Sequence, residues 1–247
     1  MPAKPAWPPK SLPRLFVRQP LAEGAHVELD AAQANYLGNV LRLREGAELL
    51  LFDGSSGEWL AHIDQSARKR MAVTVERKIR DPETIPDVWL AFAPVKRAQT
   101  DWLVEKATAL GVARLLPVMT RRTVAERVKL ERLEAIAIEA AEQCGRTRLP
   151  DIEEPLPLKR LLDHRNARRT LYFADEAGGE WAPDAFTPGA CMILTGPEGG
   201  FTEEERSAIR AAPNSIAVSL GPRILRAETA ALAALTAYMA VAGDWRP

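Results

Sequence analysis

One segment near the C-terminus constrains the fold of this chain more than any other. Residues 227–242 read AETAALAALTAYMAVA, in which Glu228 is the only charged residue. A helix that is apolar on nearly every side must be buried on nearly every side. The segment therefore predicts a helix deep inside a domain or at a subunit interface. Its many alanines would also let a neighbouring element approach closely, and we expect both roles in a homodimer.

Upstream of this helix, from residue 88 onward, strand-like and helix-like segments alternate. Apolar strand patterns occupy 88–93, 113–118, 170–174, 190–194 and 215–220. This alternation predicts an α/β domain with a largely parallel sheet covered by helices. Ligands of such sheets bind beyond the carboxyl ends of the strands.

Two amphipathic helices are predicted between the strands. Thr100 can cap the first, which ends near Gly111. The second runs from residue 130 to 144, with an apolar stripe formed by Leu133, Ala137, Ala140 and Cys144.

The N-terminal part of the chain has a different, mostly β pattern over residues 14–78. Apolar alternation at 59–63 and 71–75 and the turn cluster at 53–57 indicate short strands joined by tight turns. Several such strands predict a small barrel. We expect a short helix at 31–43. The predicted domains are 1–79, including a Pro-rich N-terminal tail, then a linker at 80–87, then 88–247.

Composition excludes some classes of protein. The 33 Lys and Arg residues balance 33 Asp and Glu residues, which argues against non-specific coating of nucleic acid. Residues 1–80 nevertheless carry 12 basic residues against 9 acids, so a local basic face is expected there. Without further information, this excess is also compatible with an ordinary solvated face.

The chain has no stretch approaching the ~20 apolar residues of a membrane span, and its first ten residues lack a signal-peptide core. We therefore expect a cytoplasmic protein with no membrane contact. Cys144 and Cys191 are distant in sequence, so we expect reduced, buried thiols. The three histidines, at 26, 62 and 164, lack ligand or triad spacing, and no metal is expected.

Two glycine-containing loops each follow an apolar strand and lead into a helix. Their sequences are LTGPEGGF at 194–201 and LGPRILR at 220–226. Such loops are usually suspected of binding phosphate. Here Thr202 and Glu205 form a capping box, and Glu198 adds another negative charge. The loops therefore favour a ligand with little negative charge, such as an adenosyl group bearing a sulfonium cation. The alternative is that the glycines only permit turns.

Both loops resemble the signature of the RsmE family, bacterial methyltransferases of the SPOUT superfamily that modify uridine N3 in small-subunit ribosomal RNA. The matching segments are TGPEGGFT at 195–202 and LGPRILRAETA at 220–230. Further segments resemble other family motifs: EKATALGV at 105–112, RRTV at 121–124, EAAEQCGR at 139–146, NYLGNVLR at 35–42 and LFDG at 51–54. Asn35 and Leu133 depart from the family's common residues, which concerns RNA contacts and local packing.

The resemblance implies a PUA-like β-barrel joined to a SPOUT α/β domain with a trefoil knot, acting as a homodimer. It implies that S-adenosylmethionine (SAM) is the cofactor. Carried over by position, the cofactor contacts are Leu194, Thr195, Gly196, Pro197, Glu198, Gly199, Leu220, Gly221, Ile224, Leu225 and Thr229.

Uridine N3 must lose a proton before or during methyl transfer, so a cation or a general base would assist. We hypothesise that Arg226, with Arg146 from either subunit, stabilises the uracil anion. Glu198 would position or deprotonate the base. For Arg226 the alternative is a structural ion pair with Glu228.

The expected partner is small-subunit ribosomal RNA within the assembled subunit, with the target base single-stranded or flipped. The expected RNA-binding residues lie in the basic N-terminal part: Arg14, Arg18, Arg42, Arg44, Arg68, Lys69 and Arg70. Two alternatives remain: a SPOUT methyltransferase acting on another base or a ribose, and a non-catalytic RNA-binding assembly factor.

Overall fold

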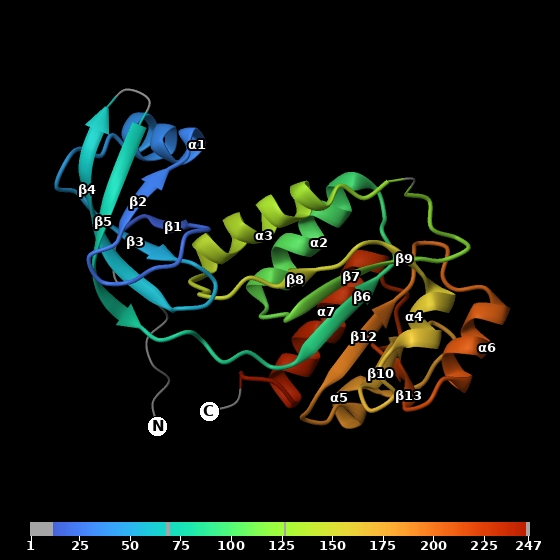
Figure 1. Cartoon of the computed structure of the whole chain (residues 1–247). Helices are drawn as coiled ribbons and strands as arrows, with labels where there is room; N and C mark the ends of the chain where they lie inside the picture. The colour runs from blue at the N-terminus through green and yellow to red at the C-terminus, as the bar shows by residue number, and fades with distance from the viewer. Residues whose placement is uncertain (1–11, 68–69, 126, 246–247) are drawn as a thin grey trace. The chain divides into compact units, whose positions relative to one another are not determined.

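The computed structural model of the chain describes residues 12–67, 70–125 and 127–245. These residues divide into two compact units (Figure 1). The first, called the α/β unit, comprises 85–140 and 150–245, and the second, called the β unit, comprises 12–84 and 141–149. The β unit thus also includes a nine-residue segment from the middle of the chain.

The α/β unit is built on one long sheet. Its strands are β6 (Val88–Phe92), β7 (Arg114–Met119), β8 (Asp151–Ile152), β9 (Leu156–Pro157), β10 (Thr170–Ala174), β11 (Glu180–Trp181), β12 (Cys191–Thr195) and β13 (Ser215–Ser219). Their order is β11-β13-β10-β12-β6-β7-β8, with β9 paired to β7. All these pairings are parallel, so the carboxyl ends of the strands lie at one edge. The predicted α/β class is confirmed.

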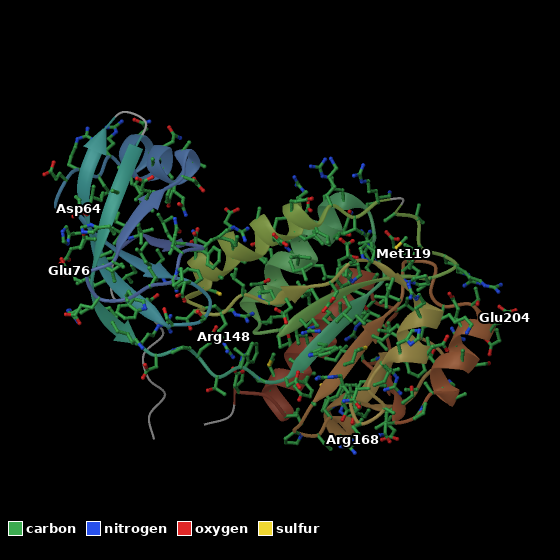
Figure 2. All side chains as sticks on the ribbon, in the orientation of Figure 1. Asp64, Glu76, Met119, Arg148, Arg168 and Glu204 are labelled. Carbon is green, nitrogen blue, oxygen red and sulfur yellow. The ribbon has the colours of Figure 1, made fainter. Side chains whose placement is uncertain are left out.

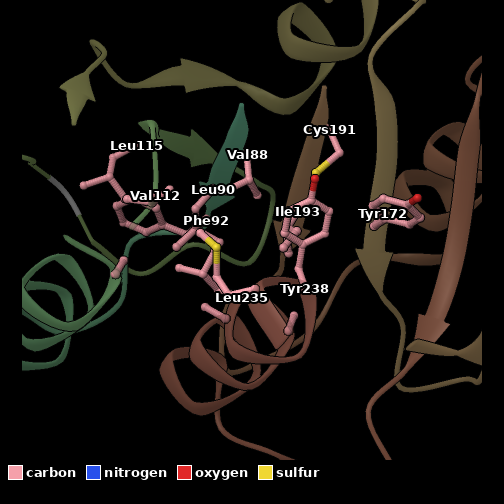
Figure 3. Packing of buried hydrophobic residues seen from close by; sticks show 14 of the residues in the cluster. Val88, Leu90, Phe92, Val112, Leu115, Tyr172, Cys191, Ile193, Leu235 and Tyr238 are labelled. Carbon is pink, nitrogen blue, oxygen red and sulfur yellow. The ribbon is translucent and has the colours of Figure 1, made fainter. Parts of the chain in front are cut away.

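Helices cover both faces of this sheet. They are α2 (Arg97–Ala109), α3 (Leu130–Cys144), α4 (Leu158–His164), α5 (Ala182–Ala185), α6 (Glu203–Ala211) and α7 (Ala227–Val241). Residues of α2, α5 and α7 share a core with Leu90 and Ile193 (Figure 3), whereas residues of α4 and α6 pack with Phe173 and Leu194. Ile193 and Leu194 point to opposite faces because side chains alternate along a strand.

One face of the final helix, α7, is buried as predicted. Ala231, Ala234 and Leu235 are completely buried in the core. Thr229 and Ala240 are exposed within the single chain. The helix is therefore a core element with a second, small-residue face that this chain does not cover.

The β unit contains a five-stranded sheet. Its strands are β1 (Arg14–Phe16), β2 (His26–Leu29), β3 (Glu48–Phe52), β4 (Glu58–Ala67) and β5 (Arg70–Arg80), in the order β1-β3-β4-β5-β2. The sheet buries Leu49, Ile63 and Val73 completely. The two edge strands, β1 and β2, do not pair with each other in the part that the structure describes, so the predicted small barrel is a half-barrel.

Three local predictions need correction. The segment 31–43 forms α1 (Ala31–Asn35) followed by one π-helical turn, η1 (Tyr36–Val40). Thr100 lies inside the first turn of α2, where its hydroxyl bonds to the backbone of Val95, and the cap residue is Lys96. Cys144 is exposed, unlike Cys191, because Ala141 takes the buried position at the end of the α3 stripe.

Candidate cofactor site

The two glycine-containing turns converge on one cavity of about 360 Å³ in the α/β unit. The turn at 195–200 follows β12 and the turn at 220–225 follows β13. Both strands pair with β10, which lies between them, so their carboxyl ends are close neighbours. The cavity therefore occupies the expected position for a ligand of a parallel sheet.

Nine of the eleven sequence-predicted cofactor residues line this cavity. They are Thr195, Gly196, Pro197, Glu198, Gly199, Leu220, Gly221, Ile224 and Leu225. The other two are outside the lining. Leu194 is completely buried within β12, and Thr229 is exposed in the first turn of α7.

A third loop, which sequence reasoning missed, also lines the cavity. It follows β10 and contributes Asp175, Glu176 and Gly178. The signal was present in the sequence, because the strand at 170–174 is followed directly by acidic residues and two glycines. The sequence did not identify this loop because its glycines, unlike those of the other two loops, are not part of the family signature.

The backbone at Gly200 adopts a conformation that disfavours a side chain, and the end of the Glu176 side chain fills the space that a Cβ would take. The φ of Gly200 is +68°, which favours glycine, and a Cβ added there would come within 2.4 Å of the Glu176 carboxylate. Gly221, at φ +114°, adopts a conformation that L-residues rarely take. The two turns thus require glycine, and one of them does so because the third loop packs directly against it.

Arginine side chains fix the positions of these loops. The Nη1 of Arg122 donates to the carbonyl oxygen of Gly199 at 2.7 Å. The Asp175 carboxylate is completely buried, forms an ion pair with the Nε of Arg206 at 3.1 Å and accepts a hydrogen bond from the Nη2 of Arg210 at 2.6 Å. Both arginines belong to α6, so this helix anchors the loop after β10.

The N-terminus of α6 is already occupied by acids. Thr202 and Glu205 form the predicted capping box, and the first turn also contains Glu203 and Glu204. A hydrogen bond from Thr202, with the nearby cation of Arg121, lowers the pKa of Glu204, which keeps it charged. A phosphate at this helix end would meet negative charge.

The charged groups that line the cavity favour a cationic ligand. Asp175, Glu176 and Glu198 contribute carboxylates, and Arg223 is the cation among the described lining residues. Exposed backbone in the glycine turns can hydrogen-bond an adenine edge or ribose. The residues present therefore suit a neutral or cationic nucleoside better than a nucleotide phosphate.

The three proposed catalytic residues are placed differently. Glu198 lines the cavity. Arg226 is the exposed N-cap residue of α7, directly between two lining residues. Its alternative role is not supported, since Arg226 and Glu228 form no ion pair in the described structure. Arg146 is buried in the β unit, where its Nε lies 3.4 Å from Glu83.

The prediction that Arg14 contacts RNA is corrected by its burial. Arg14 is 6% exposed, and its Nε donates to the buried Glu58 at 2.6 Å. Its Nη atoms donate to the backbone carbonyls of Ala141, Glu142 and Arg146. The guanidinium therefore caps the C-terminal end of α3 and is not available to a partner.

The other predicted RNA-binding residues remain candidates where the structure describes them. Arg18, Arg42 and Arg44 are exposed on the β unit. Arg68 and Lys69, together with the side chain of Arg70, lie outside the described residues.

Two negative findings apply to the described residues. None of their helices is long and apolar enough to cross a membrane. They also contain no group of three or more histidine, cysteine or carboxylate side chains arranged to hold a metal ion.

Comparison with protein families assigns both units. Residues 82–239 match an RNA methyltransferase domain, and residues 29–76 match an RNA methyltransferase PUA domain. The fold and the site thus define an RNA methyltransferase. The chain belongs to the ribosomal RNA small subunit methyltransferase E family, as relatives over nearly its whole length indicate.

Among these relatives, the enzyme named ribosomal RNA small subunit methyltransferase E in Rickettsia conorii is 32% identical, over 90% of this chain and 93% of its own. Its namesake in Synechocystis is 34% identical, over 90% and 75%. The structure of the Neisseria gonorrhoeae protein of this name, bound to S-adenosyl methionine, has a TM-score of 0.87 and 30% identity, covering 96% of this chain and all of that one. A Legionella pneumophila methyltransferase with bound SAM gives the same TM-score at 29% identity.

Proposed function

We propose that this chain methylates N3 of a uridine in small-subunit (16S) ribosomal RNA, with SAM as methyl donor. The observation that carries the proposal is the convergence of both signature turns on one carboxylate-lined cavity. Membership of the family supports the RNA substrate. The SAM bound to the N. gonorrhoeae relative supports the donor.

The cavity residues would hold SAM mainly through backbone groups. The turns that contain Gly196, Gly199 and Gly221 expose peptide groups for the adenosine, and Leu194 and Thr229 would act from beside the cavity. Bound SAM supplies a methyl group on a sulfonium cation. Because Glu176 and Glu198 bring negative charge to the same cavity, they would favour that cation electrostatically.

The main task of the protein side chains is to remove the proton from N3 and to stabilise the negative charge that this leaves on the uracil. In this proposal Glu198 positions the uracil or takes the N3 proton, and Arg226 stabilises the negative charge that then develops on the ring. Glu198 belongs to one turn that lines the cavity, and Arg226 directly follows the other. Arg146 is not kept as a second cation, because its side chain is as buried as that of Arg14 and pairs with Glu83.

We further propose that the protein is a cytoplasmic homodimer that needs no metal. The uncovered small-residue face of α7 supports self-association, because small side chains allow close packing with a second copy. The domain limits of 1–79, 80–87 and 88–247 and the trefoil knot complete the proposal. Exposed Arg18, Arg42 and Arg44 support RNA docking through the β unit.

A methylation assay on small ribosomal subunits that lack this modification tests the function. RNA recovered after reaction with labelled SAM is digested, and the labelled nucleoside is identified. We expect 3-methyluridine. Another methylated base or a 2′-O-methyl nucleoside would assign a different specificity. No product together with no SAM binding would indicate a non-catalytic assembly factor.

A further inference from the structure

A second cavity of the α/β unit lies at the carboxyl ends of β6 and β7 and has a volume of about 260 Å³. It is formed by residues 94–97 after β6 and residues 124, 125 and 127–129 after β7, together with the first turns of α2 and α3. Strand β6 pairs with β12, whose turn lines the cofactor cavity. Both cavities therefore lie along the same edge of one parallel sheet.

Positive charge dominates the rim of this second cavity. Asp101 is its one described carboxylate, and it pairs with Arg132 through a hydrogen-bonded fork of 2.6–3.0 Å. Four further cations are exposed and form no ion pair within the described part of the chain: Lys96, Arg97, Arg127 and Lys129. A cluster of unneutralised cations around a concavity attracts an anionic ligand.

The floor of the cavity is apolar. Val95 and Leu133 are buried there, and Val128 is partly buried beside them. Val124 stands at the mouth and is 73% exposed, which is unusual for a large aliphatic side chain. An apolar floor under a cationic rim matches a nucleotide, whose base has apolar faces and whose phosphate is charged.

The start of α2 adds to this charge distribution. The helix has no side-chain cap and no acid in its first turn. At the cofactor cavity, by contrast, α6 begins with Glu203, Glu204 and Glu205. One sheet edge thus presents one region that disfavours phosphate and one that attracts it.

We propose that the second cavity binds a nucleotide of the RNA strand next to the methylated uridine, with its phosphodiester on Lys96 and Arg97. The proposal rests on the proposed function, because it describes how the RNA substrate of that function meets the sheet edge. Residues 122–124 connect the two sites: Arg122 holds the cofactor turn through Gly199, and Val124 lines the second cavity. An RNA strand crossing this edge would contact both.

The first test removes two rim charges in the full-length protein, as Lys96→Gln with Arg97→Gln. The matched control is Arg160→Gln with Arg168→Gln, two exposed arginines that line neither cavity. Figure 2 shows Arg168 and Met119, the last residue of β7, at opposite ends of the α/β unit. Affinity for a small-subunit RNA fragment is measured against salt concentration, and SAM affinity is measured alongside.

We expect the rim variant to bind RNA about 10-fold more weakly at near-physiological salt, with a salt slope reduced by about 0.7, because the contact with one phosphate of a single strand is lost. Its SAM affinity should match the wild-type value, which also verifies folding. RNA affinity equal to that of the control would overturn the proposal.

A second test uses Val124, which is 73% exposed, so that its substitution leaves the core packing unchanged. Val124→Asp and Val124→Asn have nearly the same shape and differ in charge. The Asp variant should bind RNA several-fold more weakly than the Asn variant, and the gap should shrink with salt. Equal affinities would contradict a phosphate at this site. Failure to form 3-methyluridine would overturn the proposed function while leaving these affinity differences readable.

Discussion

The buried carboxylate of Asp175 lies 3.1 Å from the Nε of Arg206, and this ion pair ties the loop after β10 to helix α6. The same arginine reaches Glu176 at 2.9 Å. Glu176 in turn packs against Gly200 of the cofactor turn. The shape of the cavity therefore depends on a charge pair that contributes only one of its members to the cavity lining.

Replacing Asp175 by Asn should destabilise the protein by about 2 kcal/mol, because it removes the charge of a buried carboxylate that pairs with Arg206 and accepts a hydrogen bond from Arg210. Chemical denaturation monitored by circular dichroism measures the effect. Glu203→Gln is the control, since Glu203 pairs with the same arginine but its side chain is 80% exposed, and it should change stability by less than about 0.5 kcal/mol. Similar losses for both variants would refute the structural role of Asp175.

Glu58 should be essential to the β unit. Its completely buried side chain pairs with Arg14 and Arg80. Glu58→Gln would leave Arg14 buried without a counter-charge, at a cost of about 3–5 kcal/mol in the free energy of unfolding. Thermal and urea unfolding test this, and a loss below about 1 kcal/mol would show that the pair is not needed.

Arg14 and Arg18 should separate stability from RNA binding. Arg14→Ala removes a buried guanidinium that is bonded to Glu58, so it should lower stability. Arg18→Ala changes an exposed residue and should weaken RNA binding with little effect on unfolding. Unfolding and RNA affinity are measured for both variants. If Arg14→Ala weakened RNA binding without lowering stability, Arg14 would again be a candidate RNA-binding residue.

Cys191 should make the protein less stable in alkali. Burial raises the pKa of its thiol to about 12, and burial also raises the pKa of the neighbouring Tyr238 (Figure 3). The folded state therefore holds these protons more tightly than the unfolded chain, so this stability is complete below about pH 8.5 and is lost as the pH rises. The slope for one thiol is about 1.4 kcal/mol per pH unit.

Denaturation midpoints between pH 7.5 and 10.5 measure this dependence. Cys191→Ala should flatten it, whereas Cys144→Ala, at an exposed position, should leave it unchanged. Iodoacetamide at neutral pH should modify Cys144 and spare Cys191 in the native protein. Rapid labelling of both thiols would contradict the burial.

Arg226 should act on the uracil that accepts the methyl group and not on cofactor binding. Arg226→Ala should reduce the methylation rate by about 10²- to 10³-fold, the usual loss when a charge-stabilising donor is removed. SAM affinity should stay within about twofold, and Arg226→Lys should recover part of the rate. Single-turnover assays measure the rates, and an unimpaired alanine variant would remove Arg226 from the mechanism.

Much of the fold could be predicted from the sequence, because the spacing of apolar residues indicates which face of a helix or strand is buried. The strands from β6 to β13 that are longer than two residues, helix α3 and the capping box of Thr202 and Glu205 all have strong local signals. The cofactor site could be predicted from its glycines, because glycine adopts a backbone conformation with positive φ far more readily than other residues.

What could not be predicted depends on contacts between distant segments. In the sequence, nothing distinguishes Arg14 from the exposed Arg18. Only the fold places Glu58 and the carbonyl groups at the end of α3 beside Arg14. Asp175 likewise becomes significant only when α6 supplies its arginines. The cations of the second cavity are spread over residues 96–132, so no local motif marks them.

Calorimetric titration of SAM into matched glycine variants tests the central claim most directly. Gly200→Ala meets both a positive φ and the Glu176 carboxylate, whereas Gly24→Ala in the β unit meets a similar φ of +77° with open space. We expect one SAM site per chain in the wild type, at least tenfold weaker binding in Gly200→Ala, and unchanged affinity in Gly24→Ala. Wild-type affinity in Gly200→Ala, or no SAM binding by the wild-type protein, would contradict it.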